Sequence, residues 1–258
     1  MHCNSRSILT KLHHIEKNAN TVFSKIFATL DRDVALPTVP SPLRRKHNVL
    51  SYQLTVANIS ELIFESDWVK AVFYREPLSR FLSAYRSKCN RADADGAIWC
   101  TKAFGDANVS FHDAVSQIYM GSISNDPHFA KQSQFCGGLH ASLQYYQFKY
   151  ELDRASTRDN FIRILDSVRL PYRGKSAFAI KVNKLLPPVE VDKHRNVPRF
   201  TQSSKVLNLL KFYNRQCYIR AIVDYYQVDY DLFKINYPKW ALQALGNTSH
   251  EKCDGLTY

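Results

Sequence analysis

The sequence predicts an α/β domain with a central, mostly parallel sheet flanked by helices. Strand-like runs at residues 8–15 and 69–73 are each followed by an amphipathic helical stretch, and the same order returns at residues 143–168. Strands that alternate with helices are typical of a parallel sheet. A chain of 258 residues is long enough to bury the core of such a domain. We expect the domain to span residues 8–240, with tails at residues 1–7 and 241–258.

The first strand and helix enclose a candidate phosphate-binding loop. The helix, expected over residues 21–30, has an apolar face of Val22, Phe23, Ile26, Phe27 and Leu30. Lys17 lies in the loop and Thr21 opens the helix, so loop N–H groups, a hydroxyl and an ammonium group could surround a phosphate. A lysine ahead of a helix is more often a solvated surface residue, and this loop lacks the glycines of a Walker A motif.

The second strand and helix carry an arginine at their junction. Residues 69–73 are mostly apolar, the chain turns at residues 75–77, and Pro77 suits a first helical turn. Helical spacing then predicts one buried face, made of Leu78, Phe81, Leu82 and Tyr85. Arg75 lies where the strand ends and Ser83 lies two turns into the helix, beside a helix N-terminus that favours a phosphate. The plainer interpretation is a buried strand–turn–helix with an incidental arginine.

Two candidate histidines lie in the middle of the chain. His47 is in an irregular basic loop, which is either a solvated surface loop or part of a groove that binds a ligand. Residues 90–110 are polar and are expected to form a variable loop, and residues 111–120 a helix. His128 follows, with Phe129 and Gln132 nearby, and such side chains can hold a sugar by stacking and hydrogen bonds. The alternative is a histidine that packs and caps a turn.

The last third of the chain combines regular elements with one charged loop. We expect a strand at residues 143–150, a helix at 157–168, an extended loop at 181–200, and helices at 206–213 and 218–226. Basic residues of the loop either contact an anionic ligand or are solvated; they are Lys193, His194, Arg195 and Arg199. The aromatic residues of the ending, 226–238, are expected to close the last helix.

The net charge is +12, because 35 Lys and Arg stand against 23 Asp and Glu. Such a charge attracts polyanions over long distances, and composition alone does not separate nucleic acid from an anionic glycan. The sequence has no zinc-finger spacing, no Gly-flanked aromatic RNA-binding motif and no basic region with heptads. We therefore expect no nucleic-acid partner.

The six cysteines and the N-glycosylation sequons provide information about metal binding and about the cellular compartment of the protein. No C-x-x-C pair occurs, so we expect no metal site. Cys89 and Cys100 flank a polar stretch and are either disulfide-bonded or free buried thiols. Sequons at Asn58, Asn108 and Asn247 favour a secretory compartment. The sequence has no apolar run of 18 residues and no signal-peptide region, so membrane contact would need an N-terminal anchor absent from it.

The segment REPLSRFLSAYRSK, residues 75–88, resembles the 3′-phosphate-binding segment of carbohydrate sulfotransferases, in particular the Golgi chondroitin 4-O-sulfotransferase-like group and its invertebrate relatives. The pattern of that family, R-D/E-P-x-x-R-F/L-x-S, places its phosphate-binding Arg and Ser eight positions apart, as Arg75 and Ser83 are. The resemblance implies a P-loop-like sulfotransferase fold. It also implies the sulfate donor PAPS (3′-phosphoadenosine 5′-phosphosulfate), whose 3′-phosphate Arg75 and Ser83 would hold.

Three further segments share this resemblance. The 5′-phosphosulfate loop of the family is similar to residues 17–21, where Lys17, Ala19 and Thr21 match, Asn18 and Asn20 lie between them, and Glu16 replaces the usual proline. A second segment of the family, D-x-H-W/F-x-x-Q-x-x-x-C, matches Asp126, His128, Phe129, Gln132 and Cys136. The ending at residues 226–238 is similar to the ending of the family.

The resemblance implies sulfuryl transfer from PAPS to a hydroxyl of a glycosaminoglycan-type sugar, with chondroitin or dermatan favoured. Lys17 would stabilise the leaving phosphate oxygen, without a metal. His47 or His128 would take the hydroxyl proton, and His47 is preferred because related heparan sulfotransferases keep a catalytic histidine between the two phosphate segments. Members of the family act in the Golgi lumen, anchored in its membrane. Two other classes stay open: a degenerate relative that binds glycan or nucleotide without transfer, and a basic nucleic-acid-binding module.

Overall fold

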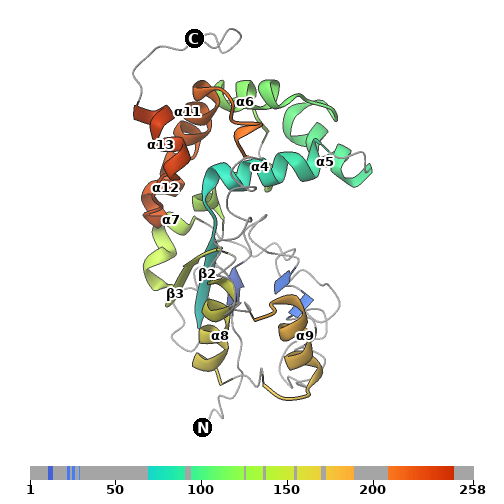
Figure 1. The fold of residues 1–258 in the computed structure, drawn as a ribbon, viewed down its shortest axis with the longest axis vertical. Coiled ribbons are helices and arrows are strands. Elements are labelled where there is room, and N and C mark those ends of the chain that lie inside the picture. Colours follow the sequence, from blue (N-terminus) through green and yellow to red (C-terminus); the bar gives the residue numbers. More distant parts are fainter. Residues whose placement is uncertain are drawn as a thin grey trace, which may run out of the picture. The chain divides into compact units, whose positions relative to one another are not determined.

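The computed structural model describes residues 11–13, 22, 23, 25, 26, 29, 69–90, 94–124, 126–135, 138–153, 156–169, 173–188 and 209–246. The chain divides into two compact units. The sheet unit comprises residues 1–74 and 135–191, and the helical unit comprises residues 75–134 and 192–258. Strands lie in the first unit, and the described residues of the second form helices and turns (Figure 1).

Three parallel strands form the sheet, in the order β1-β2-β3. β1 spans Lys11–His13, β2 spans Lys70–Tyr74 and β3 spans Phe148–Glu151. β2 is the middle strand, and its first four residues are all buried, as expected for a parallel strand covered on both faces. The predicted parallel sheet is confirmed for these three strands.

The core of the sheet unit is apolar and rich in aromatic rings. It involves α8, which spans Thr157–Ser167, and α9, which spans Ala177–Leu185. The ring of Phe23 lies 4.7 Å from that of Phe73 and 5.2 Å from that of Phe161, measured between centroids. The cluster also contains Ile26, Ala71, Ile164, Leu165, Phe178 and Val182. The described positions between residues 22 and 29 are helical, which confirms the helix predicted there.

The helical unit is assembled around α4 and α11. Its elements are α4 (Pro77–Lys88), α5 (Ala94–Phe104), α6 (Phe111–Tyr119), η1 (Gln132–Gln134), α11 (Gln216–Tyr225), α12 (Gln227–Phe233) and α13 (Lys239–Gly246). α4 packs against α5 and α11, and α11 packs against α6 and α13. The ring of Phe111 lies in this packing, 5.1 Å from Tyr85 and 5.2 Å from Phe212.

The strand–turn–helix predicted around Arg75 is confirmed. Pro77 occupies the first position of α4, where its missing N–H leaves no hydrogen bond unmade. The predicted buried face is also found, because Leu78, Phe81, Leu82 and Tyr85 are all buried. On the other side, Ser79 and Ser83 are half-buried and Arg86 is exposed.

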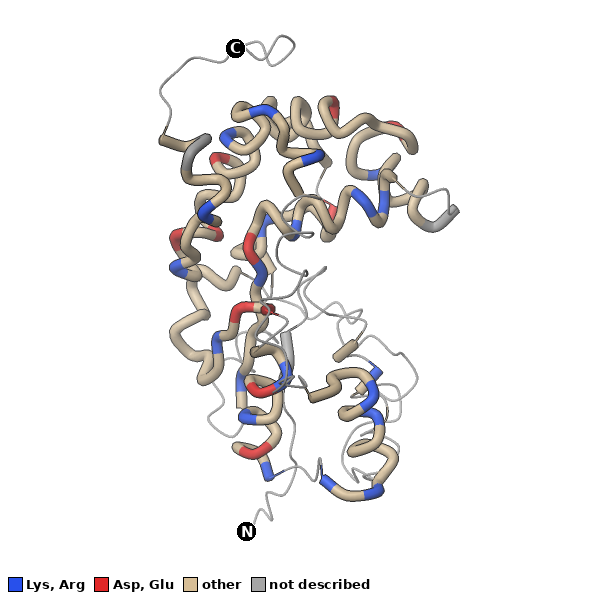
Figure 2. Tube along the Cα trace, viewed as in Figure 1, with Lys and Arg blue, Asp and Glu red and all other residues tan. Residues whose placement is uncertain are grey.

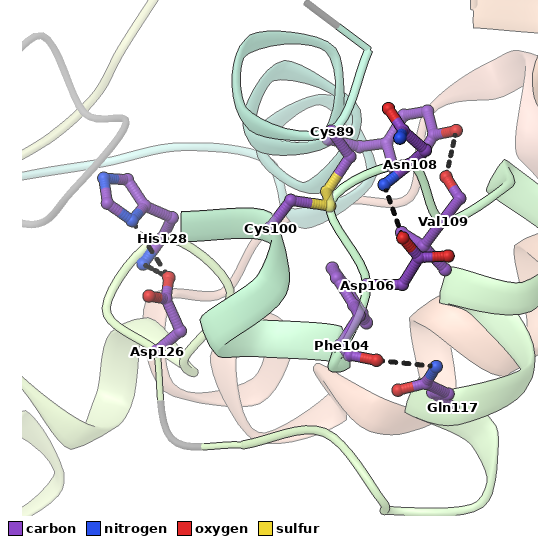
Figure 3. Close-up of a disulfide and its surroundings, with 10 residues drawn as sticks. Cys89, Cys100, Phe104, Asp106, Asn108, Val109, Gln117, Asp126 and His128 are labelled. Carbon is purple, nitrogen blue, oxygen red and sulfur yellow. Dashed lines mark hydrogen bonds and ion pairs between the residues drawn. A yellow bond between two sulfur atoms is a disulfide. The ribbon is translucent and has the colours of Figure 1, made fainter. Parts of the chain in front are cut away.

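The loop predicted at residues 90–110 is wrong, because α5 occupies most of it. Gly96, Cys100, Ala103 and Phe104 are buried and follow one another at i, i+4, i+7 and i+8, which is an apolar helical face. Cys100 is disulfide-bonded to Cys89 just after α4, with a Cα–Cα distance of 5.0 Å (Figure 3). The alternative of free thiols is therefore excluded for this pair. Cys217 is also disulfide-bonded.

Other boundaries differ from the predictions. The strand expected from residue 143 begins at Phe148, because α7 (Leu139–Ser142) and η2 (Leu143–Tyr145) form helical turns first. The loop expected at 181–200 is wrong up to Leu185, since α9 continues that far and buries Val182. The helix expected at 206–213 is seen only at 209–210, and the chain turns at 211–212. The helices at 111–120, 157–168 and 218–226 are confirmed within two residues.

In the part of the chain that the structure describes, we find no helix with the length and apolar character needed to cross a membrane.

Candidate functional site

Arg75 lies in the turn that joins the end of β2 to α4, and Gln132 holds its backbone. The N–H of Arg75 donates to Gln132 Oε1 at 2.9 Å, and its carbonyl accepts from Gln132 Nε2 at 2.8 Å. Gln132 is fully buried, so breaking this pair would leave buried amide groups without partners. The turn that presents Arg75 is thus fixed by one side chain on both of its backbone groups.

Gln132 is itself held by α12. Its own N–H and that of Ser133 donate to the two carboxylate oxygens of Asp229, at 2.7 Å and 2.8 Å. Asp229 is fully buried, and a buried carboxylate is stable only when such donors compensate its charge. The last helix of the predicted family ending therefore supports the Arg75 turn through the loop after His128.

Glu76, the residue after Arg75, caps α4 and contacts the same helix α12. Its carboxylate accepts from the N–H groups of Leu78 at 2.8 Å and Ser79 at 2.7 Å, and from the hydroxyl of Tyr230 at 2.6 Å. We expected the N-terminus of α4 to favour a phosphate. Two of its amides, those of Leu78 and Ser79, already bind this carboxylate and are therefore not available to an anion.

The charge of Arg75 is held in a partly buried place. Burial lowers the pKa of Arg75 below its ordinary value; Glu76 opposes this shift and Arg80 adds to it. The arginine side chain nevertheless stays protonated in proteins. Arg80 is fully buried, and its guanidinium donates to the carbonyls of Ala130 at 2.7 Å and Pro127 at 3.1 Å. Two neighbouring cations of reduced hydration favour a bound anion at Arg75.

His128 forms a second polar pair with Asp126, a few residues before Gln132 in the chain. It is buried; its Nδ1 lies 2.9 Å from Asp126 Oδ1, and its backbone N–H donates to the same oxygen at 2.8 Å. The second ring nitrogen points away from Asp126 (Figure 3). A carboxylate on Nδ1 favours the tautomer with the proton there, which leaves Nε2 as a hydrogen-bond acceptor. Such an imidazole can take a proton from a hydroxyl.

Several predicted site residues lie outside the described residues. These are Lys17, Asn18, Ala19, Asn20 and Thr21 of the first phosphate loop, and His47. Their roles stay predictions, as does that of Ser83, which is half-buried one helical turn after Ser79. Among the described residues, no group of three or more His, Cys, Asp or Glu is placed to hold a metal ion.

Sequence reasoning missed the residues that support the site. From the sequence we expect Gln132 to hold a sugar, Tyr230 to help close the last helix with its aromatic ring, and Glu76 to lie in a turn. The rings of Tyr230 and Tyr237 do meet at 4.7 Å, but the Tyr230 hydroxyl also reaches Glu76, 154 positions away in the chain. The available signal was a buried pattern interrupted by polar residues, as at Asp229 between Tyr226 and Tyr230, which are both buried.

The geometry thus brings together three separate stretches, residues 75–83, 126–133 and 226–230. No curated protein and no solved structure matches the chain significantly. A family model described as "Sulfotransferase family" matches residues 12–238, which contain all three stretches. Because this match covers most of the 258 residues, the chain belongs to the sulfotransferase family.

Proposed function

We propose that the chain is a PAPS-dependent carbohydrate O-sulfotransferase, which moves the sulfuryl group of PAPS to a hydroxyl of a glycosaminoglycan-type sugar such as chondroitin or dermatan. The observation that carries the proposal is the Arg75 turn. Gln132, itself held by Asp229, fixes the backbone of this turn, which carries a partly buried guanidinium in a chain of the sulfotransferase family. Fixing a cation before the ligand arrives lowers the entropic cost of binding a phosphate.

The donor would be held at two places. Arg75, with Ser83 on α4, would bind its 3′-phosphate, because a guanidinium and a hydroxyl donate charge-assisted hydrogen bonds to phosphate oxygens. Residues 17–21, which are Lys17, Asn18, Ala19, Asn20 and Thr21, would bind the 5′-phosphosulfate with their N–H groups and the Thr21 hydroxyl. Lys17 would stabilise the negative charge that develops on the bridging oxygen.

The transfer step needs a base for the acceptor hydroxyl. A bond forms between the hydroxyl oxygen and sulfur, the bond between sulfur and the bridging oxygen breaks, and the hydroxyl proton passes to a histidine. The 3′,5′-bisphosphate PAP then leaves with the bridging oxygen. His128 and His47 are the two candidates, and the contact of His128 Nδ1 with Asp126 supports His128, since a carboxylate stabilises the imidazolium that forms.

The donor site is tested by calorimetric titration with PAP and by transfer of radiolabelled sulfate from PAPS to desulfated glycosaminoglycans. We expect Arg75→Ala to weaken PAP binding on the order of 100-fold, the size expected for lost charge-assisted hydrogen bonds. Arg86→Ala is the matched control, because Arg86 is an exposed arginine of the same helix, and it should leave PAP binding unchanged. Equal PAP affinity in the Arg75→Ala variant would refute this assignment.

The same two measurements separate the proposal from its alternatives. Glu16 brings an acid beside the first phosphate loop, and it favours a relative that binds without transfer. Binding of PAP with no labelled product on any acceptor would establish that alternative.

For the base, His128→Ala and His47→Ala are compared, and the variant with wild-type turnover excludes its residue. Retention on DNA rather than on heparin at moderate salt would favour a nucleic-acid-binding module.

We also propose that the protein acts in the Golgi lumen. The disulfide between Cys89 and Cys100 supports an oxidising compartment, since such bonds are rare in the cytosol. Asn108, in the sequon Asn108-Val109-Ser110, is exposed in the turn between α5 and α6, as a glycosylated asparagine must be. A glycosidase-sensitive mass shift that is lost in Asn108→Gln would support this compartment, whereas free thiols and no glycan in protein from its native cell would refute it.

A further inference from the structure

The ends of α4 and α5 hold a cluster of basic and aromatic side chains beside His128. Lys88 directly precedes Cys89, and Trp99 directly precedes Cys100, so the disulfide brings the two neighbours together. Lys102 lies three positions after Trp99, on the adjacent turn of α5. Figure 2 draws the basic residues of the two helices in blue, several on α4 and one on α5. We call Lys88, Trp99 and Lys102 the lysine–tryptophan cluster.

The indole of Trp99 organises this cluster. The ammonium nitrogen of Lys88 lies 5.7 Å from the ring centroid and that of Lys102 lies 5.1 Å from it, both within the range of cation–π contacts. The ring of His128 meets the same indole edge-on, at 4.9 Å between centroids. One half-buried indole therefore links two ammonium groups to the candidate base.

The charges of the cluster are poorly compensated by the side chains that the structure describes. Among the side chains that the structure describes, no carboxylate forms an ion pair with Lys88 or Lys102, and Asp126 is engaged by His128. Two ammonium groups that share one ring repel each other, and an anion bound between them would remove that cost. The indole also limits the freedom of both side chains, so less entropy is lost when the anion binds.

We infer that the lysine–tryptophan cluster is an acceptor subsite, which binds a carboxylate or sulfate group of the glycan next to the sugar whose hydroxyl faces His128. This inference rests on the proposed function for the acceptor's chemistry. Lys88 and Lys102 bind the anionic group, and Trp99 positions them. The disulfide fixes the separation between the two helices that carry them, so the subsite is present before the acceptor arrives.

The first test measures binding without the donor. A chondroitin hexasaccharide is titrated into the wild type, into Lys88→Ala/Lys102→Ala and into the control Arg86→Ala/Lys211→Ala, which loses the same charge elsewhere in the helical unit. We expect the cluster variant to bind the hexasaccharide about tenfold more weakly, as one half-buried and one exposed charge contact are lost, and to bind PAP as the wild type does. Unchanged hexasaccharide affinity, or no binding by the wild type, would overturn the inference.

The second test separates positioning by Trp99 from a simple charge effect. Trp99→Phe keeps an aromatic ring and should retain most of the affinity, whereas Trp99→Leu should lose about as much as the double lysine variant. In Lys88→Ala/Lys102→Ala, the KM for chondroitin should rise while turnover of an uncharged N-acetylgalactosamine glycoside stays the same. Equal loss on both acceptors, or equal competition by single-stranded DNA of the same charge, would contradict the subsite.

Failure of the proposed function gives a different pattern. Arg75→Ala should abolish transfer and leave hexasaccharide binding intact, because Arg75 is assigned to the donor. If the wild type binds PAP and the hexasaccharide but transfers nothing, the enzyme assignment fails while the subsite stands. If it transfers sulfate and the cluster variant keeps its KM for chondroitin, the subsite fails while the enzyme assignment stands.

Discussion

The sheet unit and the helical unit are stabilised in different ways. The sheet unit packs Phe23, Phe73 and Phe161 into an apolar cluster, and Lys70 is the one buried charged residue among its described residues. The helical unit also has an apolar core, but around the Arg75 turn it buries Glu76, Arg80, Gln132 and Asp229. Each of these groups has hydrogen-bond partners on another segment. Buried polar networks are stable only when their members are satisfied, so they are costly, and here they surround the candidate site.

The comparison has a physical consequence. An apolar core responds to a substitution mainly through lost volume and area, and neighbouring side chains can adjust. A polar network responds through unpaired groups, which cannot be compensated by adjustment. We therefore expect substitutions in the sheet unit to lower stability, and substitutions around Asp229 and Tyr230 to lower both stability and donor binding.

The largest effect is expected in the sheet unit. Phe161→Ala should lower the free energy of unfolding by about 3–5 kcal/mol, because the ring is fully buried against Phe23. Hydrogen exchange should accelerate in β2, β3 and α8, with little change in α11 and α12. Arg163→Ala, an exposed change on the same helix, serves as the control. Equal acceleration in both units would show that they unfold as one, and the comparison would lose its basis.

The next effect is alkaline destabilisation of the helical unit. Burial raises the pKa of Tyr213, Tyr226 and Tyr230, and Glu76 adds to the shift of Tyr213 and of Tyr230. Above about pH 10 the unfolded tyrosines lose protons that the folded ones keep, so stability falls as pH rises. Each of the three tyrosines should lower the free energy of unfolding by about 1 kcal/mol between pH 10 and pH 11. Urea unfolding across this range checks it, and a flat profile would contradict the burial of these hydroxyls.

The disulfide should contribute a comparable amount, confined to the helical unit. Replacing Cys89 and Cys100 together by Ala should cost about 2.5 kcal/mol, since the bond closes a short loop in the unfolded chain. Exchange should accelerate at the end of α4 and in α5 and leave the sheet unit unchanged. The double substitution should also weaken hexasaccharide binding, because the lysine–tryptophan cluster loses its fixed spacing. Unchanged exchange in α5 would contradict this role.

The smallest effect is expected from removing a single hydroxyl, which tests whether the buried polar network around Glu76 supports the donor site at Arg75. Tyr230→Phe removes one hydroxyl and its hydrogen bond to the Glu76 carboxylate, which should cost about 2 kcal/mol. PAP binding should weaken as well, since Glu76 adjoins Arg75. The loss of stability at alkaline pH should be smaller by the contribution of one tyrosine. Tyr145→Phe is the control, because Tyr145 is exposed. Loss of stability with wild-type PAP affinity would separate the network from the donor site.

Local interactions account for what could be predicted. Pro77, Glu76 and the apolar spacing of α4 act within a few residues of one another, so the strand–turn–helix was readable. The prediction failed at α5, where polar residues at 93 and 95 concealed an apolar face that becomes clear only once Cys100 is tied to Cys89. The candidate site was readable for Arg75, Ser83 and His128 only through their resemblance to a family, because no local rule distinguishes them.

The sequence by itself determined the strands and helices around Arg75 and the membership of the sulfotransferase family, because spacing, capping and motif letters are local properties. Only the tertiary structure decided which residues support the site. Gln132 contacts Arg75 across 57 positions, Asp229 contacts Gln132 across 97, and Tyr230 contacts Glu76 across 154. Each of these pairs forms because burial leaves a polar group no water to bind, so it must find its partner wherever the packing of distant helices places one.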